Sequence, residues 1–234
     1  MLTALLWGSV AASSLIVGAL AGAARTWNQR LIGLVLGFGA GALVSSISFE
    51  LAEEGFRVGG AIPVALGLAV GAIAFYTADR MVDRLGGDNA KTSGTPLLIG
   101  ALLDGIPEQA VLGIGIATGG AVSPALLLAI FVSNLPEAIG SANDMRAAGH
   151  PMKRVVGGWV LIAAMCAAAT VGGFQLQEVA GNAFQGGVDG FAAGALLVML
   201  VGSMIPEATE KAREPAGLAA VLGFALAAGL SLAA

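Results

Sequence analysis

The sequence predicts an all-α, polytopic membrane protein with eight transmembrane helices. Of its 234 residues, 57% are hydrophobic and 11% are charged, and the mean hydropathy is +0.88. Soluble domains carry about 25% charged residues. We therefore expect the lipid bilayer to be the solvent, and the main partner, of most of this chain.

Eight apolar windows of about 20 residues, the length that crosses a bilayer, predict the individual helices. The chain also holds 36 glycines. Because small residues let membrane helices approach closely, we expect one tightly packed bundle. The helices are expected near Leu2–Ala24, Leu31–Glu54, Gly59–Met81, Thr95–Thr118, Val122–Met145, Val155–Leu176, Gly187–Glu210 and Pro215–Ala233.

The positive charges predict how these helices are oriented. If both termini lie outside, ten of the 11 Lys and Arg residues fall in inside connections, and only Arg57 falls outside. A Lys/Arg excess in short cytoplasmic loops sets orientation. We expect an integral protein of the plasma (inner) membrane with both termini outside. The inside residues are Arg25, Arg30, Arg80, Arg84, Lys91, Arg146, Lys153, Arg154, Lys211 and Arg213.

A short repeat relates the two ends of the chain. The segments Gly37–Leu43 and Gly190–Leu196 agree at six of seven positions with an offset of 153, which also places Glu54 on Glu207. The two segments run in opposite directions across the expected membrane, so the repeat is inverted, an arrangement typical of transporters. The alternative is a chance match between Gly/Ala-rich helices. The chain is thus one transmembrane domain, 1–234, divided into a three-helix repeat (1–81), a central pair (95–145) and an inverted three-helix repeat (155–233).

The central pair carries two polar motifs in the same frame. One reads Asp104-Gly105-Ile106-Pro107-Glu108 and the other reads Ser133-Asn134-Leu135-Pro136-Glu137, 29 residues later. A mid-helix Asp costs about 2.5–3.5 kcal/mol on membrane-insertion scales. Intramembrane carboxylates usually face a bundle interior and mark an ion or proton path.

The spacing within each motif places its polar side chains on one helix face. Asp104 and Glu108 are i,i+4, as are Ser133 and Glu137, with Asn134 one turn before Glu137. Each proline also frees a backbone carbonyl one turn earlier. Antiparallel neighbours would bring together mostly oxygen donors, which suit hard or borderline divalent cations. A polar clamp between the helices, or a carboxyl pair sharing a proton, is the alternative.

These motifs resemble those of the ZIP (Zrt/Irt-like) family of divalent metal transporters. The family's helix-four signature is His-Asn-x-Pro-Glu-Gly, its helix-five motif ends in x-Pro-Glu, and Ile205-Pro206-Glu207 echoes its helix-seven motif. Here Asp104 replaces the helix-four histidine, Gly105 the asparagine, and Ser133 the helix-five His or Gln. Helix six lacks the acid that some members add. The match is therefore firmest at Glu108 and Glu137.

The resemblance implies eight helices in an inverted three-plus-two-plus-three arrangement, with a metal site formed by Asp104, Glu108, Ser133, Asn134 and Glu137. It implies uptake of a divalent metal substrate (Zn, Mn, Fe or Cd) into the cytoplasm, no enzymatic activity, and a possible homodimer. Because zinc favours nitrogen and sulfur ligands, the missing histidines indicate a relaxed or hard-metal preference. The alternatives are proton-coupled transport of another solute and a non-transporting scaffold or sensor.

Acids near the helix ends extend this hypothesis to a pathway. Glu50 and Glu54 lie at the outer end of the second helix, where clustered acids raise the local cation concentration. Glu207 lies at the inner end of the seventh helix, near Lys211. Solvated helix ends and ordinary interfacial ion pairs are the alternatives.

The composition excludes several other classes. One cysteine, Cys166, rules out an intrachain disulfide and a thiolate cluster, and one histidine, His150, rules out a multi-His site. No basic face indicates a nucleic-acid partner. A serine intramembrane protease would need a membrane-embedded histidine, and an aspartyl protease would need two deep aspartates. The chain offers neither.

Overall fold

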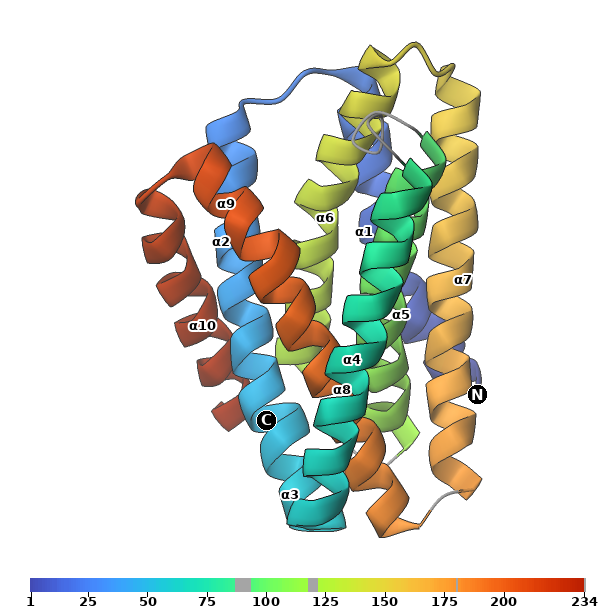
Figure 1. Ribbon diagram of the computed structural model, residues 1–234, viewed down its shortest axis with the longest axis vertical. Coiled ribbons are helices and arrows are strands. Elements are labelled where there is room, and N and C mark those ends of the chain that lie inside the picture. The colour runs from blue at the N-terminus through green and yellow to red at the C-terminus, as the bar shows by residue number, and fades with distance from the viewer. Residues whose placement is uncertain (87–93, 118–121, 180, 234) are drawn as a thin grey trace.

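The computed structural model describes residues 1–86, 94–117, 122–179 and 181–233, and all the regular structure in these ranges is helical (Figure 1). Eight helices are long and apolar enough to cross a membrane, so the expected all-α, polytopic fold is confirmed. The helices are α1 (Leu2–Ala24), α2 (Gln29–Ser46), η1 (Ile47–Ala52), α3 (Glu53–Gly59), α4 (Ala61–Gly86), α5 (Gly94–Ala117), α6 (Pro124–Ala147), α7 (Met152–Val179), α8 (Asn182–Met199), η3 (Leu200–Met204), α9 (Ile205–Ala212) and α10 (Pro215–Ala233).

The helix ends agree with those expected from hydropathy to within five residues, and the third span shows one of the largest differences. The third span, α4, continues to Gly86 instead of ending near Met81, because the polar residues Asp79–Arg84 extend the helix beyond its apolar part. Lys91 and the predicted connection 119–121 lie outside the described residues.

The second and seventh spans each change from α-helix to a π-helical turn near their middle. The π turns, η1 and η3, begin at Ile47 and Leu200, which are 153 residues apart, the offset of the sequence repeat. Figure 1 shows α2 and α8 running in opposite directions. Because π turns are rare and concentrate at functional sites, their matched positions are a second and independent sign of an inverted repeat.

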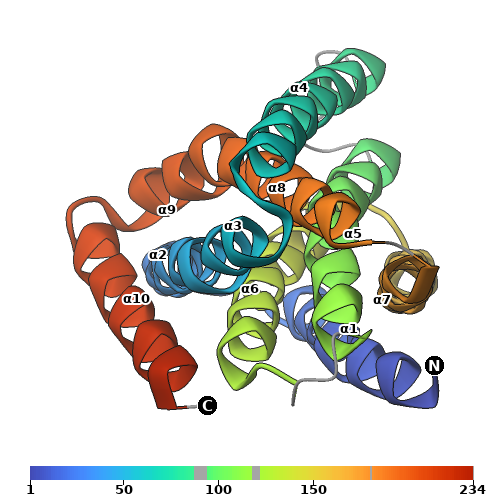
Figure 2. The same cartoon turned by 90° about the horizontal axis from the view of Figure 1, so that it is seen from below.

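The same symmetry governs how the helices pack. Between the two repeats, α4 packs along α8 and α10 packs along α2; likewise α5 packs on α7 and α6 packs on α1. Figure 2 shows α5 and α6 with α2 and α8 on one side and α1 and α7 on the other. The central helix pair is therefore held at the middle of the bundle by both repeats.

Glycines make the closest of these contacts. A Cβ on Gly71 of α4 would clash with the carbonyl oxygen of Phe191, and one on Gly223 of α10 would clash with that of Phe38. Phe38 and Phe191 are themselves 153 residues apart. The backbones touch at equivalent places in the α4–α8 pair and the α10–α2 pair, which only a residue without a side chain allows.

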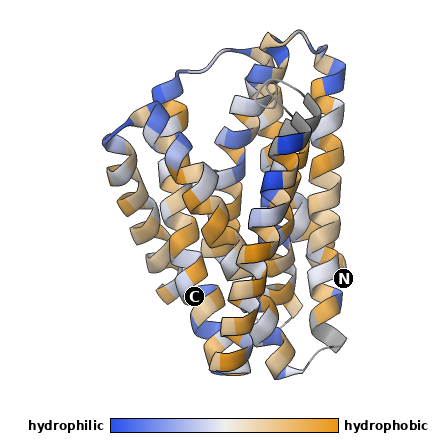
Figure 3. Ribbon diagram, in the orientation of Figure 1, coloured by the Kyte–Doolittle hydropathy of each residue, from blue (hydrophilic) through white to orange (hydrophobic). Residues whose placement is uncertain are grey.

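The two ends of the bundle differ in polarity. Both termini lie at one end (Figure 1), whereas hydrophilic residues gather at the opposite end (Figure 3). The α1–α2 and α9–α10 connections, which carry Arg25 and Arg213, and the last turn of α6, which carries Arg146, lie at this second end. We refer to it as the basic end and to the other as the terminal end.

The paired glycines generate a test of the packing. Gly71→Ala and Gly223→Ala should each destabilise the protein by about 1–3 kcal/mol, because a methyl group must force two backbones apart. Gly229→Ala, on the same helix as Gly223 but with open space around it, should be neutral or stabilising by up to about 1 kcal/mol through helix propensity. Thermal unfolding of purified protein in detergent measures all three, and equal melting of the three variants would contradict this packing.

Candidate functional site

Glu108 is the most deeply buried acid at the centre of the bundle. Its side chain is only 1% exposed. The Ser133 hydroxyl of α6 lies 3.3 Å from Glu108 Oε1 and donates across the helix pair, while Oε2 has no hydrogen-bond partner in the part of the chain that the structure describes. A buried carboxylate oxygen without a partner is costly, so this oxygen is a candidate ligand atom.

Two helices that continue through a proline bring these groups together. Pro107 lies inside α5 and Pro136 inside α6, each one residue before a glutamate. A proline has no N–H to donate to the carbonyl four residues earlier. The carbonyls of Leu103 and Val132 thus lose their usual helical partner beside the carboxylates, where membrane protein backbone needs another donor or a cation.

Asn134 adds a second incompletely satisfied group. It is 1% exposed, and its Nδ2 has no hydrogen-bond partner within the described ranges. Helices of both repeats contact this part of α6. Gly39 of α2 packs against the backbone of Ser133, and the Met204 methyl group of η3 lies beside Gly39. The neighbourhood of Ser133 and Asn134 is therefore built by both halves of the repeat.

Asp104 and Glu137, both half-buried, complete the set. The carboxyl group of Glu137 lies close enough to those of Asp104, Glu108 and Glu207 for their negative charges to repel one another. Glu207 forms an ion pair with Lys211, and this pair lies beside Gly140, one turn beyond Glu137 on α6. The acids thus follow one another from Glu108 toward the basic end.

The sequence-predicted residues fall into two groups. The structure brings Glu108 and Ser133 into contact, buries Asn134 next to them, and places Asp104, Glu137 and Glu207 within electrostatic range. Glu50 and Glu54 lie elsewhere, in a pocket toward the terminal end. In the described ranges no three His, Cys, Asp or Glu side chains are close enough together to hold a metal ion.

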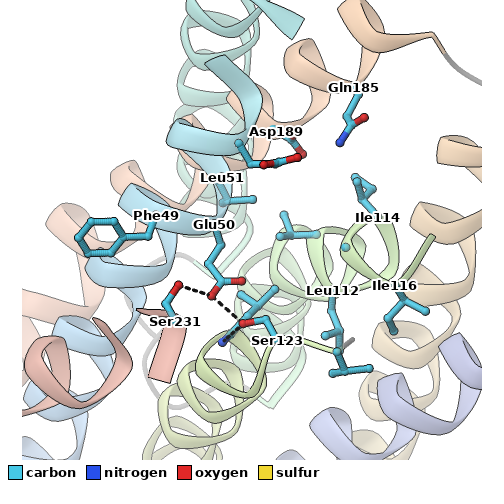
Figure 4. A pocket seen from close by; sticks show the side chains of 15 residues that line it. Phe49, Glu50, Leu51, Leu112, Ile114, Ile116, Ser123, Gln185, Asp189 and Ser231 are labelled. Atoms are coloured by element: carbon cyan, nitrogen blue, oxygen red, sulfur yellow. Dashed lines mark hydrogen bonds between the residues drawn. The ribbon is translucent and has the colours of Figure 1, made fainter. Parts of the chain in front are cut away.

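The pocket toward the terminal end has a volume of about 440 Å³ (Figure 4). Glu50 Oε1 accepts hydrogen bonds from Ser123 Oγ at 2.6 Å and Ser231 Oγ at 3.0 Å. Glu50 therefore links η1 to the start of α6 and the end of α10. Glu54 is instead held by Arg57 in a salt bridge of 2.6 Å at the surface.

Sequence reasoning missed Asp189, which lines the same pocket from α8. It is 3% exposed, and none of the residues that the structure describes forms a hydrogen bond with its Oδ2. Figure 4 shows Asp189 and Gln185 on the side of the pocket opposite Ser123. The signal was present, since Asp189 is a lone acid inside an apolar window, which marks a functional position by default.

An apolar layer separates this pocket from Glu108. Leu51 and Leu112 line the pocket and are buried in the main hydrophobic core. Leu112 lies one turn from Glu108 along α5, and Ile130, fully buried, lies one turn from Ser133 along α6. Glu108 is thus closed off on the terminal side, while the half-buried acids approach it from the basic side.

Helix α7 packs against α5 next to the Pro-Glu motif and contacts Gly105 and Gln109. The Thr170 hydroxyl donates to Gln109 Oε1 at 2.6 Å in a fully buried contact. One turn away, Cys166 Sγ faces Gly105, where an added Cβ would lie 2.6 Å from the sulfur. The sequence left the direction of Cys166 open, and the structure places it against the site helix.

No protein-family model matches this sequence, and no curated protein matches it either.

The Thr170–Gln109 contact generates a stability prediction. Thr170→Val should destabilise the protein by about 1–3 kcal/mol, because Gln109 is left buried without its hydrogen bond. The double variant Thr170→Val/Gln109→Leu should recover part of this loss, since both polar partners are then absent.

Thr77→Val is the matched control, because the Thr77 hydroxyl is exposed and bonds only to carbonyls of its own helix. Its melting temperature should stay near wild type. An unchanged Thr170→Val variant would show that the buried contact does not hold α5 in place.

Proposed function

We propose that the chain is a ZIP-like transporter that moves a divalent metal cation across the membrane through the centre of α5 and α6. The observation that carries this proposal is the buried Glu108 carboxylate, with one oxygen near the Ser133 hydroxyl and the other unpaired. A divalent cation would supply the missing partner. Asp104, Asn134 and Glu137 are the further proposed ligands, with the carbonyls freed by the two prolines.

The oxygen-rich chemistry of this site bears on the choice of metal. Carboxylate, hydroxyl and amide oxygens suit Mn²⁺ and Fe²⁺, and zinc accepts carboxylates although it favours nitrogen and sulfur. We therefore propose Mn, Fe or Zn as the substrate class, with Cd as an analogue. The acids of the described site are spread more widely than a metal coordination shell, so side-chain rotation must precede ligation.

The two sides of Glu108 suggest how the cation moves. Asp104, Glu137 and Glu207 lead from Glu108 to the basic end, and the pocket with Glu50 and Asp189 reaches toward it from the terminal end. Movement of the joined α4–α8 and α10–α2 pairs against the central pair would open the apolar layer around Leu112. By the positive-inside rule we propose that the basic end is cytoplasmic. Both termini would then lie outside, and movement of the cation toward the basic end would be uptake. We also propose that the protein forms a homodimer.

One observation favours a proton-linked alternative. Because the described carboxyl groups stand apart instead of forming a closed metal cluster, the site could carry protons that are coupled to another solute. This alternative shares Glu108 with the metal proposal but predicts no stabilisation by metal.

Metal binding to the purified protein separates the two. Mn²⁺ or Fe²⁺ should raise the melting temperature of wild type, by the equivalent of about 2.7 kcal/mol when the metal is at 100 times its Kd. Glu108→Gln and Glu137→Gln should each lose most of this shift, because a neutral amide is a poorer cation ligand.

Glu53→Gln is the control, since Glu53 is an exposed acid at the start of α3. It should keep the full shift. A metal response that is equal in all four proteins would locate binding outside the site, and no response in wild type would favour the proton-linked alternative.

A further inference from the structure

A second cavity, of about 560 Å³, lies at the basic end between the start of α2 and the turn that joins α9 to α10. It has three cationic residues, Arg30, Lys211 and Arg213, and one acid, Glu214. Lys211 is paired with Glu207. Neither Arg30 nor Arg213 forms a salt bridge with any residue in the described part of the chain. Two arginines thus line this cavity without a salt bridge in the described residues, and its positive charges outnumber its one acid, Glu214.

The backbone at Arg213 gives a second and independent observation. Arg213 ends α9 with φ 57° and ψ −143°. Glycine adopts such a conformation without strain, whereas an L-residue with a side chain does not. A strained arginine at a turn that would favour glycine indicates that the side chain itself has a use there.

An apolar groove continues from the basic cavity along the same helices. It has a volume of about 140 Å³ and runs where α9 and α10 diverge from their common turn (Figure 2). Ala208 lies one turn before Ala212 of the cavity, and Ala216 directly follows Pro215. The groove is lined by Gly37, Ala40, Gly41, Val44, Ile205, Ala208, Thr209, Ala216, Gly217 and Ala220.

We propose that this cavity and groove bind one anionic phospholipid, with its phosphate between Arg30 and Arg213 and the start of an acyl chain in the groove. Arginine binds phosphate oxygens through paired N–H donors. Basic pockets between transmembrane helices at the cytoplasmic face suit anionic head groups. The charge of the cavity matches the head group, and the groove beneath it matches the chain. The inference depends on the membrane-spanning fold and not on metal transport.

The test compares lipids with matched acyl chains added to the purified protein in detergent. Phosphatidylglycerol should raise the melting temperature of wild type, and phosphatidylcholine should not, because its head group is zwitterionic. Inorganic phosphate is the third addition, since it offers the same anion without an acyl chain. Phosphate alone should give little of the shift.

Two variants locate the effect. Arg213→Gly relieves the backbone strain, so it should fold at least as well as wild type, yet it should lose much of the phosphatidylglycerol shift. Arg30→Gln/Arg213→Gly should lose most of it. Arg154→Gln, which removes a positive charge near the start of α7 and outside this cavity, should keep it.

Each other outcome overturns the proposal. Equal shifts in Arg154→Gln and the cavity variants would mean that the lipid effect reflects general charge at this end. An equal effect of phosphate would identify the ligand as a free anion, and no shift by phosphatidylglycerol in wild type would leave the cavity without a lipid. None of these results depends on whether the protein binds metal.

Discussion

A carboxylate enclosed by apolar helices is the constraint on which the arrangement depends. Glu108 is almost fully buried, and among the described residues Ser133 is its one hydrogen-bond partner and one of its oxygens has none. In a low-dielectric interior such a group must be protonated or must meet a cation. The surrounding features follow this need: half-buried acids on one side, an apolar layer on the other, and two prolines that release backbone carbonyls nearby.

The inverted repeat explains why this carboxylate lies at the centre. Both halves pack their own outer helix against the central pair, and both place a π turn at the same position of the repeat. Glycine contacts between backbones join α4 to α8 and α10 to α2, so each tight pair takes one helix from each repeat. Such joined pairs can move against the central helices without repacking internally, which is what the proposed alternating access requires.

The sequence predicted those features of the fold and site that depend on the length and polarity of single membrane spans. Apolar length identified the eight spans, and the matched Pro-Glu motifs on two antiparallel neighbours predicted that the polar faces carrying Glu108 and Ser133 would meet. It was uninformative about rotation around the helix axes. Spans that are apolar on every side carry little periodicity to distinguish lipid from core, so the contact of Cys166 with Gly105 could not be predicted.

Long-range polar contacts were hidden for the same reason. The hydrogen bonds from Ser123 and Ser231 to Glu50 join residues 73 and 181 positions apart. They depend on how three spans meet, which no local pattern encodes. Asp189 differs, because a lone acid in an apolar window could have been singled out from its position alone.

The central claim is that Glu108 binds a divalent cation, and the most direct test is an anomalous difference map from crystals grown with Mn²⁺. The account predicts a peak about 2.0–2.6 Å from Glu108 Oε2, the range of oxygen–cation distances for hard divalent cations, that is absent in Glu108→Gln crystals. A map with manganese only in the pocket by Glu50 and Asp189, or with none near α5 and α6, would contradict it.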